Sequence, residues 1–269
     1  VHIENSNGLN VERHSRYAFL VAEAICVQNG ETKTNYEYTR CNTLKDIDLD
    51  ALATEAVTGA VASFGAESIS SGTYPVVLDK KVVSSLLDAF SNIFSANSVL
   101  KNMSFLKDKL GEEVFGKNIT LIDDPLFWEA QQQYSFDDEG VATCTKAVVE
   151  NGVLKTYLHN LKTAAMMQVK STGNGFKNSV NSSVDIQPAN LYLKAGDTSL
   201  EEMFKQLQNG VYITSVAGLH AGLNPISGSF NLQSSGFLIE NGRKTKPVTL
   251  IIISGTLQEL LNNVSYVGN

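Results

Sequence analysis

Short runs of apolar and β-branched residues recur along the chain, and asparagine–glycine pairs separate several of them. Two such runs between Tyr17 and Tyr38 flank the first pair. Asn-Gly readily supplies the two positive φ angles of a type I′ turn, which matches the twist of antiparallel strands. The pattern therefore predicts antiparallel hairpins at three places: Asn29-Gly30, Asn151-Gly152 and Asn241-Gly242.

Other β-rich runs complete the predicted sheets. The run Tyr74 to Leu78 reads "YPVVL" and is predicted to be a strand. Further strands are predicted at residues 119–122, 143–150, 153–158, 211–216, 236–240 and 247–253. The Gly-, Asn- and Ser-rich run 171–183 is predicted to be an exposed loop, either mobile or in contact with a partner.

Apolar residues at helical spacing alternate with these strands. The clearest case is residues 82–94, where the positions i, i+3, i+4 and i+7 are apolar, and we expect Leu86, Leu87, Phe90 and Phe94 to be core. Other helices are predicted at residues 44–64, 104–110, 161–167, 199–207 and 256–264. The fold class is therefore α+β, with mainly antiparallel and partly barrel-like sheets and several amphipathic helices.

Composition narrows the classes of partner. The formal net charge is −7 and the pI is about 5.2, which argues against nucleic acid because phosphate contacts need clustered Lys and Arg. Apolar runs such as residues 248–253 are too short to span a membrane. Three cysteines without close spacing indicate reduced, mostly buried thiols and a cytoplasmic location.

The common catalytic centres are not favoured by the sequence. The four histidines, His2, His14, His159 and His220, share no predicted helix, so a helical zinc motif is excluded. The G-x-S-x-G turn of a serine hydrolase is also absent.

An acidic turn is the next candidate for a cation-binding or catalytic site. Asp137, Asp138 and Glu139 precede Gly140, and paired carboxylates can bind a cation or act as acid and base. The favoured interpretation is a turn in which the Asp side chains accept backbone N–H groups, because calcium-loop spacing is absent.

Two glycine-rich segments are the remaining candidate functional sites. "STGNGFK" around Asn174 has glycines and a lysine but not the Walker spacing. "GLHAGLNPISGSF", residues 218–230, carries His220, Asn224 and Ser227 and is predicted to be a tight loop, with lining of a cleft as the alternative.

Several motifs in order resemble the TldD/PmbA family, and specifically its PmbA (TldE) branch, named "modulator of DNA gyrase". They are "SFLKDKLGEEVF", "ITLIDDP", "FDDEGVAT", "LHNLKTA", "STGNG", "GLHAGLNPISGSF" and "GFLIENGRKTKPV". The resemblance implies a C-terminal domain at residues 75–269. It also implies that residues 1–74 are a hairpin and helix segment continuing from a missing N-terminal domain.

The family resemblance also implies a cytoplasmic metalloprotease in which TldD-type and TldE-type subunits pair to cleave unfolded or linear peptides. In the TldD branch, a helix after a "VVL" strand carries H-E-x-x-x-H. Here Asp88, Ala89 and Ile93 stand at or within a residue of those positions, and none can serve there. No catalytic or metal-binding residue is therefore expected on this chain, and the metal, zinc, is expected on a TldD-type partner.

The predicted function is a metal-free subunit that holds an extended peptide or its partner by strand addition, paired with a TldD-like subunit or with itself. Contacts are expected from His220, Asn224, Ser227 and Asn174. Two alternatives stay open. One is an autonomous peptidase using Asp88, His220 or the acidic turn, and the other is a regulator of DNA gyrase acting through protein contacts.

Overall fold

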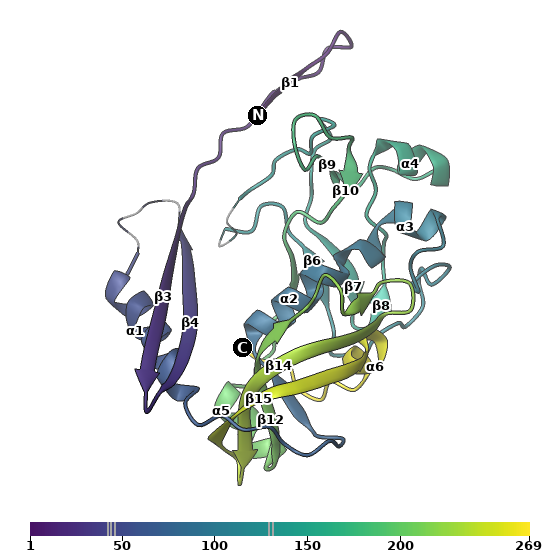
Figure 1. Cartoon of the computed structure of the whole chain (residues 1–269). Coiled ribbons are helices and arrows are strands. Elements are labelled where there is room, and N and C mark those ends of the chain that lie inside the picture. The colour runs from purple at the N-terminus through teal and green to yellow at the C-terminus, as the bar shows by residue number, and fades with distance from the viewer. Residues whose placement is uncertain (42, 44, 46, 129, 131) are drawn as a thin grey trace.

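The computed structural model describes residues 1–41, 43, 45, 47–128, 130 and 132–269. It confirms a mixed fold dominated by antiparallel pairing, with one sheet curled into a half-barrel (Figure 1). The three Asn-Gly pairs form the predicted turns, and all six of their residues have positive φ.

The N-terminal part contains two hairpins and one helix. β1 (His2–Glu4) pairs with β2 (Asn10–Glu12), and β3 (Ala18–Gln28) pairs along its whole length with β4 (Glu31–Cys41). α1 (Leu49–Ala62) covers one face of the β3–β4 ribbon and buries Ala56 and Ala60 against Ala24. The helix predicted from residue 44 begins only at Leu49, after its N-cap Asp48, and Leu44 lies outside the described residues.

The half-barrel sheet has the order β5-β12-β14-β15. β5 (Val76–Leu78) joins β12 (Gly210–Ala217) in parallel, whereas β14 (Ser229–Glu240) pairs antiparallel with β12, β15 (Arg243–Thr256) and the short β13 (Leu223–Asn224). Both long strands exceed the predicted ranges. α5 (Leu200–Leu207) contacts β5 and β15, and α6 (Leu257–Asn262) continues directly from β15.

A second sheet has the order β11-β6-β7-β8. Its strands are β11 (Leu191–Leu193), β6 (Leu121–Asp123), β7 (Lys146–Glu150) and β8 (Val153–Leu154), all antiparallel. β9 (Gly175–Phe176) and β10 (Asp185–Ile186) form a separate short pair near α4 (Leu161–Met167).

The predicted amphipathic helix at residues 82–94 lies in the main core. It is α2 (Lys80–Phe90) followed by the 3-10 helix η2 (Ser91–Phe94), and α3 (Ala96–Leu100) comes next. Leu86, Leu87, Phe90 and Phe94 are all buried, as predicted. The same core takes in apolar side chains of both sheets and of α6, so α2 links the two halves of residues 71–269.

The helix predicted at residues 104–110 is wrong. The Ser104 hydroxyl accepts the N–H of Leu106, the segment closes i to i+3 turns, and Asp108 has a φ of 62°. A left-handed residue ends a right-handed helix, so local bonds replace helical ones. The strand predicted at 153–158 extends only to Leu154.

Two further predictions need correction. The loop 171–183 is exposed only in its second half, because residues 173–176 are buried. The cysteines are free, but Cys144 is exposed and Cys26 and Cys41 are half-buried, so the thiols are not mostly buried. None of the helices that the structure describes is long and apolar enough to cross a membrane.

Candidate functional site

An apolar groove lies along the outer edge of β15. β14 occupies one side of β15, and on the other side Glu67 pairs with it at Val248: the Glu67 N–H donates to the Pro247 carbonyl at 3.4 Å, and the Thr249 N–H donates to the Glu67 carbonyl at 3.1 Å. Within the described residues no strand pairs with this side of β15 from Leu250 onward. On this side, the backbone groups of β15 from Leu250 onward therefore have no neighbouring strand.

A short irregular segment forms the opposite wall of the groove. After Glu67, residues 68–74 cross from the edge of β15 to β5, and the Tyr74 hydroxyl donates to the Ser70 carbonyl at 2.8 Å. The space between this crossing segment and the sheet encloses about 550 Å³. Its lining is Ile69, Ser70, Ser71, Gly72, Thr73, Tyr74, Val76, Leu78, Val211, Ile213, Phe230, residues 250–254 and Leu260.

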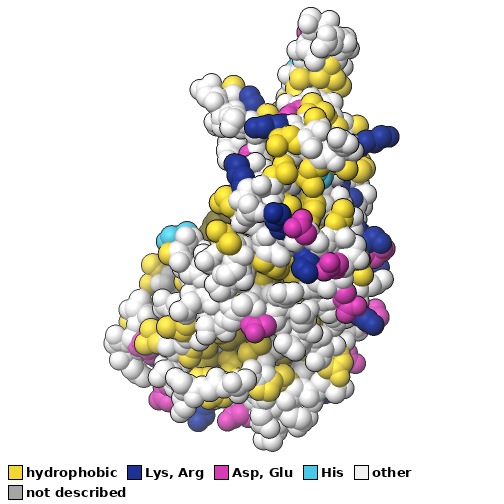
Figure 2. Space-filling model, turned by 90° about the vertical axis from the view of Figure 1, so that its right-hand side faces the viewer, with side chains coloured by type: hydrophobic (Ala, Val, Ile, Leu, Met, Phe, Trp, Pro, Cys, Tyr) yellow, Lys and Arg dark blue, Asp and Glu magenta, His cyan; other side chains and the backbone are white. Residues whose placement is uncertain are grey.

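The groove is apolar and open. Leu250 is 73% exposed and Ile252 is 68% exposed, although both lie in a long strand. Figure 2, seen from the right-hand side of Figure 1, shows hydrophobic side chains gathered over the lower half of that face. Native sheets usually protect long apolar edges with charge, proline or a covering segment, so an open one is typical of a binding surface.

Leu250 marks the point where the free edge begins. Its φ is 53°, and the pairing of β14 with β15 shifts register between Ser234 and Gly236, which leaves an extra residue on β15 opposite this point. Such a bulge bends a strand and increases its twist. The bend separates the part of β15 that pairs with Glu67 from the part that lines the groove.

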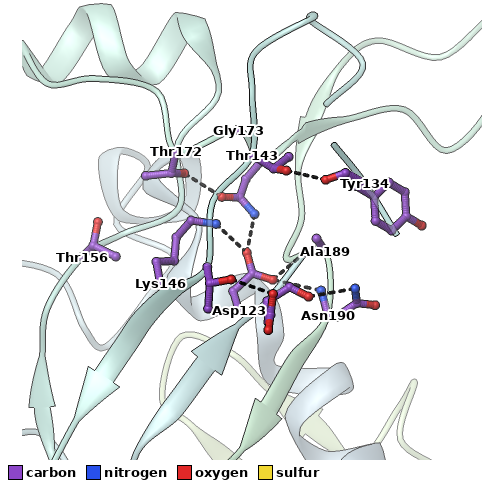
Figure 3. Close-up of polar contacts among 12 residues, drawn as sticks. Asp123, Tyr134, Thr143, Lys146, Thr156, Thr172, Gly173, Ala189 and Asn190 are labelled. Carbon is purple, nitrogen blue, oxygen red and sulfur yellow. Dashed lines mark hydrogen bonds and ion pairs between the residues drawn. The ribbon is translucent and has the colours of Figure 1, made fainter. Parts of the chain in front are cut away.

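A buried polar cluster surrounds Asp123 at the end of β6 (Figure 3). Lys146 forms an ion pair with its Oδ2 at 2.9 Å, and the backbone N–H groups of Ala189 and Asn190 donate to its Oδ1 at 2.8 and 2.9 Å. The Asn174 amide donates to Oδ2 at 2.8 Å. Asp123 is fully buried, and four donors occupy its carboxylate.

This cluster joins loops and does not offer a reactive group. Asn174 donates also to the Gln187 carbonyl and accepts from the Thr172 hydroxyl, and its side chain is fully buried. The cluster therefore ties residues 172–174 and 187–190 to two strands of the second sheet. Asn174 does not lie near the surface with the other predicted contact residues.

In the acidic turn, Asp137 and Asp138 accept backbone N–H groups, as predicted. Asp137 is fully buried and accepts the N–H groups of Glu139, Val141 and Gly175, at 2.9 to 3.0 Å. Asp138 accepts the N–H of Lys177 at 2.9 Å and lies 3.9 Å from the Arg13 guanidinium. These bonds confirm the expectation that backbone donors and a cation occupy the two carboxylates.

Glu139 extends the turn to a helix. Its Oε2 accepts the N–H of Leu161, the first residue of α4, at 2.7 Å. Burial raises the pKa of Glu139, and the nearby charge of Asp137 adds to the effect. Burial likewise raises the pKa of Asp137, despite its three backbone donors. Each of the three acids accepts a backbone N–H group, so the turn holds neighbouring loops and the start of α4 in place.

The glycine-rich segment forms a surface hairpin. β13 pairs Leu223 with Phe230 and Asn224 with Ser229, so this tight loop is a turn between the short β13 and the start of the long β14. The Asn224 Oδ1 accepts the N–H groups of Ile226 and Ser227, as in an Asx turn. His220, Asn224 and Ser227 are all exposed: His220 lies in the turn before β13, Asn224 in β13 and Ser227 in the turn after it.

A metal site does not fit the positions aligned with the active branch. Asp88 is exposed on α2, whereas Ile93 is fully buried in the main core, so no ligand set converges there. Within the described part of the chain, no three His, Cys, Asp or Glu side chains come close enough to hold an ion.

Comparison with known proteins gives the family. Residues 71–269 match the PmbA/TldA metallopeptidase C-terminal domain and residues 1–64 match the PmbA/TldA metallopeptidase central domain. The chain belongs to the PmbA/TldD family. Its members include a metalloprotease of Methanocaldococcus jannaschii, 31% identical over 267 residues, a match that covers 97% of this chain and 58% of the relative.

Solved structures of the family have the same fold. A Thermotoga maritima protein named as a modulator of DNA gyrase superposes with a TM-score of 0.94 at 41% identity, covering 100% of this chain and 61% of that one. TldE from Thermococcus kodakarensis superposes with a TM-score of 0.92 at 25% identity, with the same coverage of both chains. The chain thus spans about three fifths of these relatives' length.

The groove was not found by reading the sequence. The run 247–253 is recognisable as a strand, but its composition does not say which side stays unpaired. A weak signal existed, because "ISSGTYP", residues 69–75, shows neither helical nor strand periodicity before a clear strand. That segment forms one wall of the groove.

Proposed function

We propose that this chain is a metal-free member of a metallopeptidase assembly, and that it binds an extended peptide along the free edge of β15 from Leu250 onward. The observation that carries the proposal is an unpaired, apolar strand edge beside an open groove. A peptide that adds there as a strand gains backbone hydrogen bonds that do not depend on its sequence. This suits a protein that handles unfolded chains.

The chain's own Glu67 supports this mode of binding. Glu67 already pairs in parallel with Val248, through two backbone hydrogen bonds, at the position next to the free stretch. The edge is therefore accessible to an added strand and has the backbone geometry for it. A bound peptide would continue the pairing that Glu67 begins.

Cleavage is assigned to a partner. The family consists of metallopeptidases, whereas the aligned positions of α2 carry Asp88, Ala89 and Ile93 and offer no ligand set. The similarity to a TldE structure supports pairing with a TldD-type subunit that holds the zinc, or with a second copy of this chain. His220, Asn224 and Ser227 are the proposed contacts of the surface hairpin with that partner or the peptide.

The test uses peptides with blocked backbone N–H groups. An unstructured, fluorescently labelled peptide is titrated with the chain, and two further versions carry N-methyl groups, one at alternate residues and one at every residue. In strand addition only one set of N–H groups faces the edge, so the alternately methylated peptide can still turn its free set toward β15. We expect it to bind as the parent does, and the fully methylated version to lose at least tenfold in affinity.

Two results would contradict strand addition. Equal affinities of the parent and the fully methylated version would indicate that the peptide binds by other means. No measurable binding of the parent peptide would remove the peptide-holding role and favour the alternative of a regulator that contacts other proteins, as the name of the Thermotoga relative suggests.

A further inference from the structure

We propose that the hollow beneath the crossing segment, residues 68–74, is a side-chain pocket that selects an uncharged, apolar residue of the bound peptide. This inference rests on the proposed binding of an extended peptide at β15. Strand pairing alone would tolerate any sequence, so the pocket would give the site a preference that the backbone contacts cannot provide.

The floor of the pocket is part of the main core. Val211 and Ile213 of β12 and Phe230 of β14 line it and are only 2%, 1% and 7% exposed. These side chains pack against the buried core on their other sides, so the floor is held in place without a ligand. A volume of about 550 Å³ falls within the range of about 300–1,000 Å³ typical of small-molecule pockets.

The lining carries no formal charge. Among the described residues that line the hollow there is no Asp, Glu, Lys, Arg or His, and its polar groups are the hydroxyls of Ser70, Ser71, Thr73, Tyr74 and Ser254. An ionised side chain placed there would lose water without gaining a counter-charge, which is strongly unfavourable. An apolar side chain would instead bury its surface against Ile213 and Phe230.

The geometry of β15 indicates which peptide positions are read. Ile251 and Ile253 pack toward the core, whereas Leu250 and Ile252 are exposed on the opposite face of the strand. A strand added beside β15 has the same alternation, so every second side chain points toward the hollow. The preference should therefore concern one residue, with a weaker effect two positions away and none at its direct neighbours.

The occupant is a peptide strand because of the surroundings of the pocket. The hollow is continuous with the free edge of β15, and the adjoining part of that edge already pairs in parallel with one residue, Glu67, through two backbone hydrogen bonds. A compact apolar molecule could fill the hollow but would leave the unpaired backbone unused. An added strand satisfies both features together.

The experiment compares guest residues in one host peptide. An unstructured host of Ser, Thr and Gly carries a single guest residue, Leu, Gly or Asp, and its dissociation constant for the chain is measured by fluorescence anisotropy. We expect the Leu guest to bind at least tenfold tighter than the Asp guest, with Gly between them.

Matched variants place a charge inside and outside the pocket. Thr73→Glu puts a carboxylate on the exposed wall, and Ser68→Glu puts the same group on the crossing segment away from the lining. Both positions are exposed, so both variants should fold. We expect Thr73→Glu to weaken Leu-guest binding at least tenfold and Ser68→Glu to leave it unchanged.

The possible failures are distinguishable. Equal affinity for all three guests would overturn the pocket and leave peptide binding at the edge intact. No binding of any guest would overturn both proposals. A dimer, detected by light scattering, that excludes peptide and is broken by Thr73→Glu but not by Ser68→Glu would show that a second copy fills the groove, and would overturn the peptide pocket.

Discussion

Leu250 is the residue at which β15 changes from a paired to a free strand. A branched side chain with a φ of 53° is strained, and this side chain is 73% exposed, so packing does not compensate for the strain. Strain retained at an exposed position beside a groove is consistent with a role in shaping that groove. The bulge lies at the start of the stretch, Leu250 to Ser254, that lines the hollow.

Replacement of Leu250 tests this strain directly. Leu250→Gly should leave the free energy of unfolding unchanged or raise it by up to about 1 kcal/mol, because glycine adopts positive φ without steric cost. Ile252→Gly is the matched control in an extended part of the same strand, and it should lower stability by about 1 kcal/mol. Urea denaturation measures both, and equal losses in the two variants would contradict strain at Leu250.

At the scale of elements, the acidic turn connects parts of the chain that the sheets do not join. Glu139 accepts the first N–H of α4, Asp137 accepts the N–H of Gly175 at the start of β9, and Arg13 donates to the Phe136 carbonyl at 2.7 Å. The turn therefore fixes α4, the β9–β10 pair and the N-terminal segment to one another. Its carboxylates act as acceptors between elements.

The pKa of Glu139 predicts how this junction responds to pH. Because burial raises the pKa of Glu139 above its ordinary value of 4.5, the folded state binds the proton more strongly than the unfolded state. The resulting stabilisation is fully present below pH 4.5 and is lost as the pH rises through the folded-state pKa. Relative to Glu139→Gln, the wild type should therefore lose stability between pH 4 and pH 7.

Glutamine keeps an acceptor for the Leu161 N–H, so Glu139→Gln should be at least as stable as the wild type at pH 7. Glu139→Ala removes that acceptor and should cost about 1 kcal/mol at any pH. Urea denaturation of all three proteins across this range measures the differences. A stability difference between wild type and Glu139→Gln that does not change with pH would refute the assignment.

At the scale of the whole molecule, the chain has the fold of a metallopeptidase family without a metal-ligand set in its described residues. We therefore expect this chain alone to hold no stoichiometric zinc and to leave an unstructured peptide intact. Mixing it with a TldD-type subunit should give cleavage that exceeds the activity of that subunit alone. Metal analysis and peptide turnover, followed by mass spectrometry, measure both expectations.

Different results would support different functions. Zinc-dependent cleavage by this chain alone would make it an autonomous peptidase. Capture of gyrase with no effect on a TldD-type subunit would favour a regulator. His220→Ala in the mixture is informative as well, because a contact residue should weaken assembly or peptide binding and leave turnover of the bound peptide largely intact.

The sequence by itself determined the features that depend on neighbouring residues. Asn-Gly pairs set three turns because few other dipeptides accept two positive φ angles, and the spacing of Leu86, Phe90 and Phe94 predicted the buried face of α2 and η2. The absence of H-E-x-x-x-H and the low content of Lys and Arg could also be read directly from the sequence. Each of these properties is local or compositional, so no folded partner is needed to read it.

Only the tertiary structure decided the features that depend on distant residues. Asn174 looked like a surface residue, but the buried carboxylate of Asp123, far away in sequence, draws its amide inward. Residues 104–110 have helical spacing, yet bonds from Ser104 and the packing of Leu106 in the core hold them in turns. The free edge of β15 exists because β14 takes one side and Glu67 pairs only at Val248, and strand neighbours are chosen by the packing of the whole sheet rather than by the strand's own sequence.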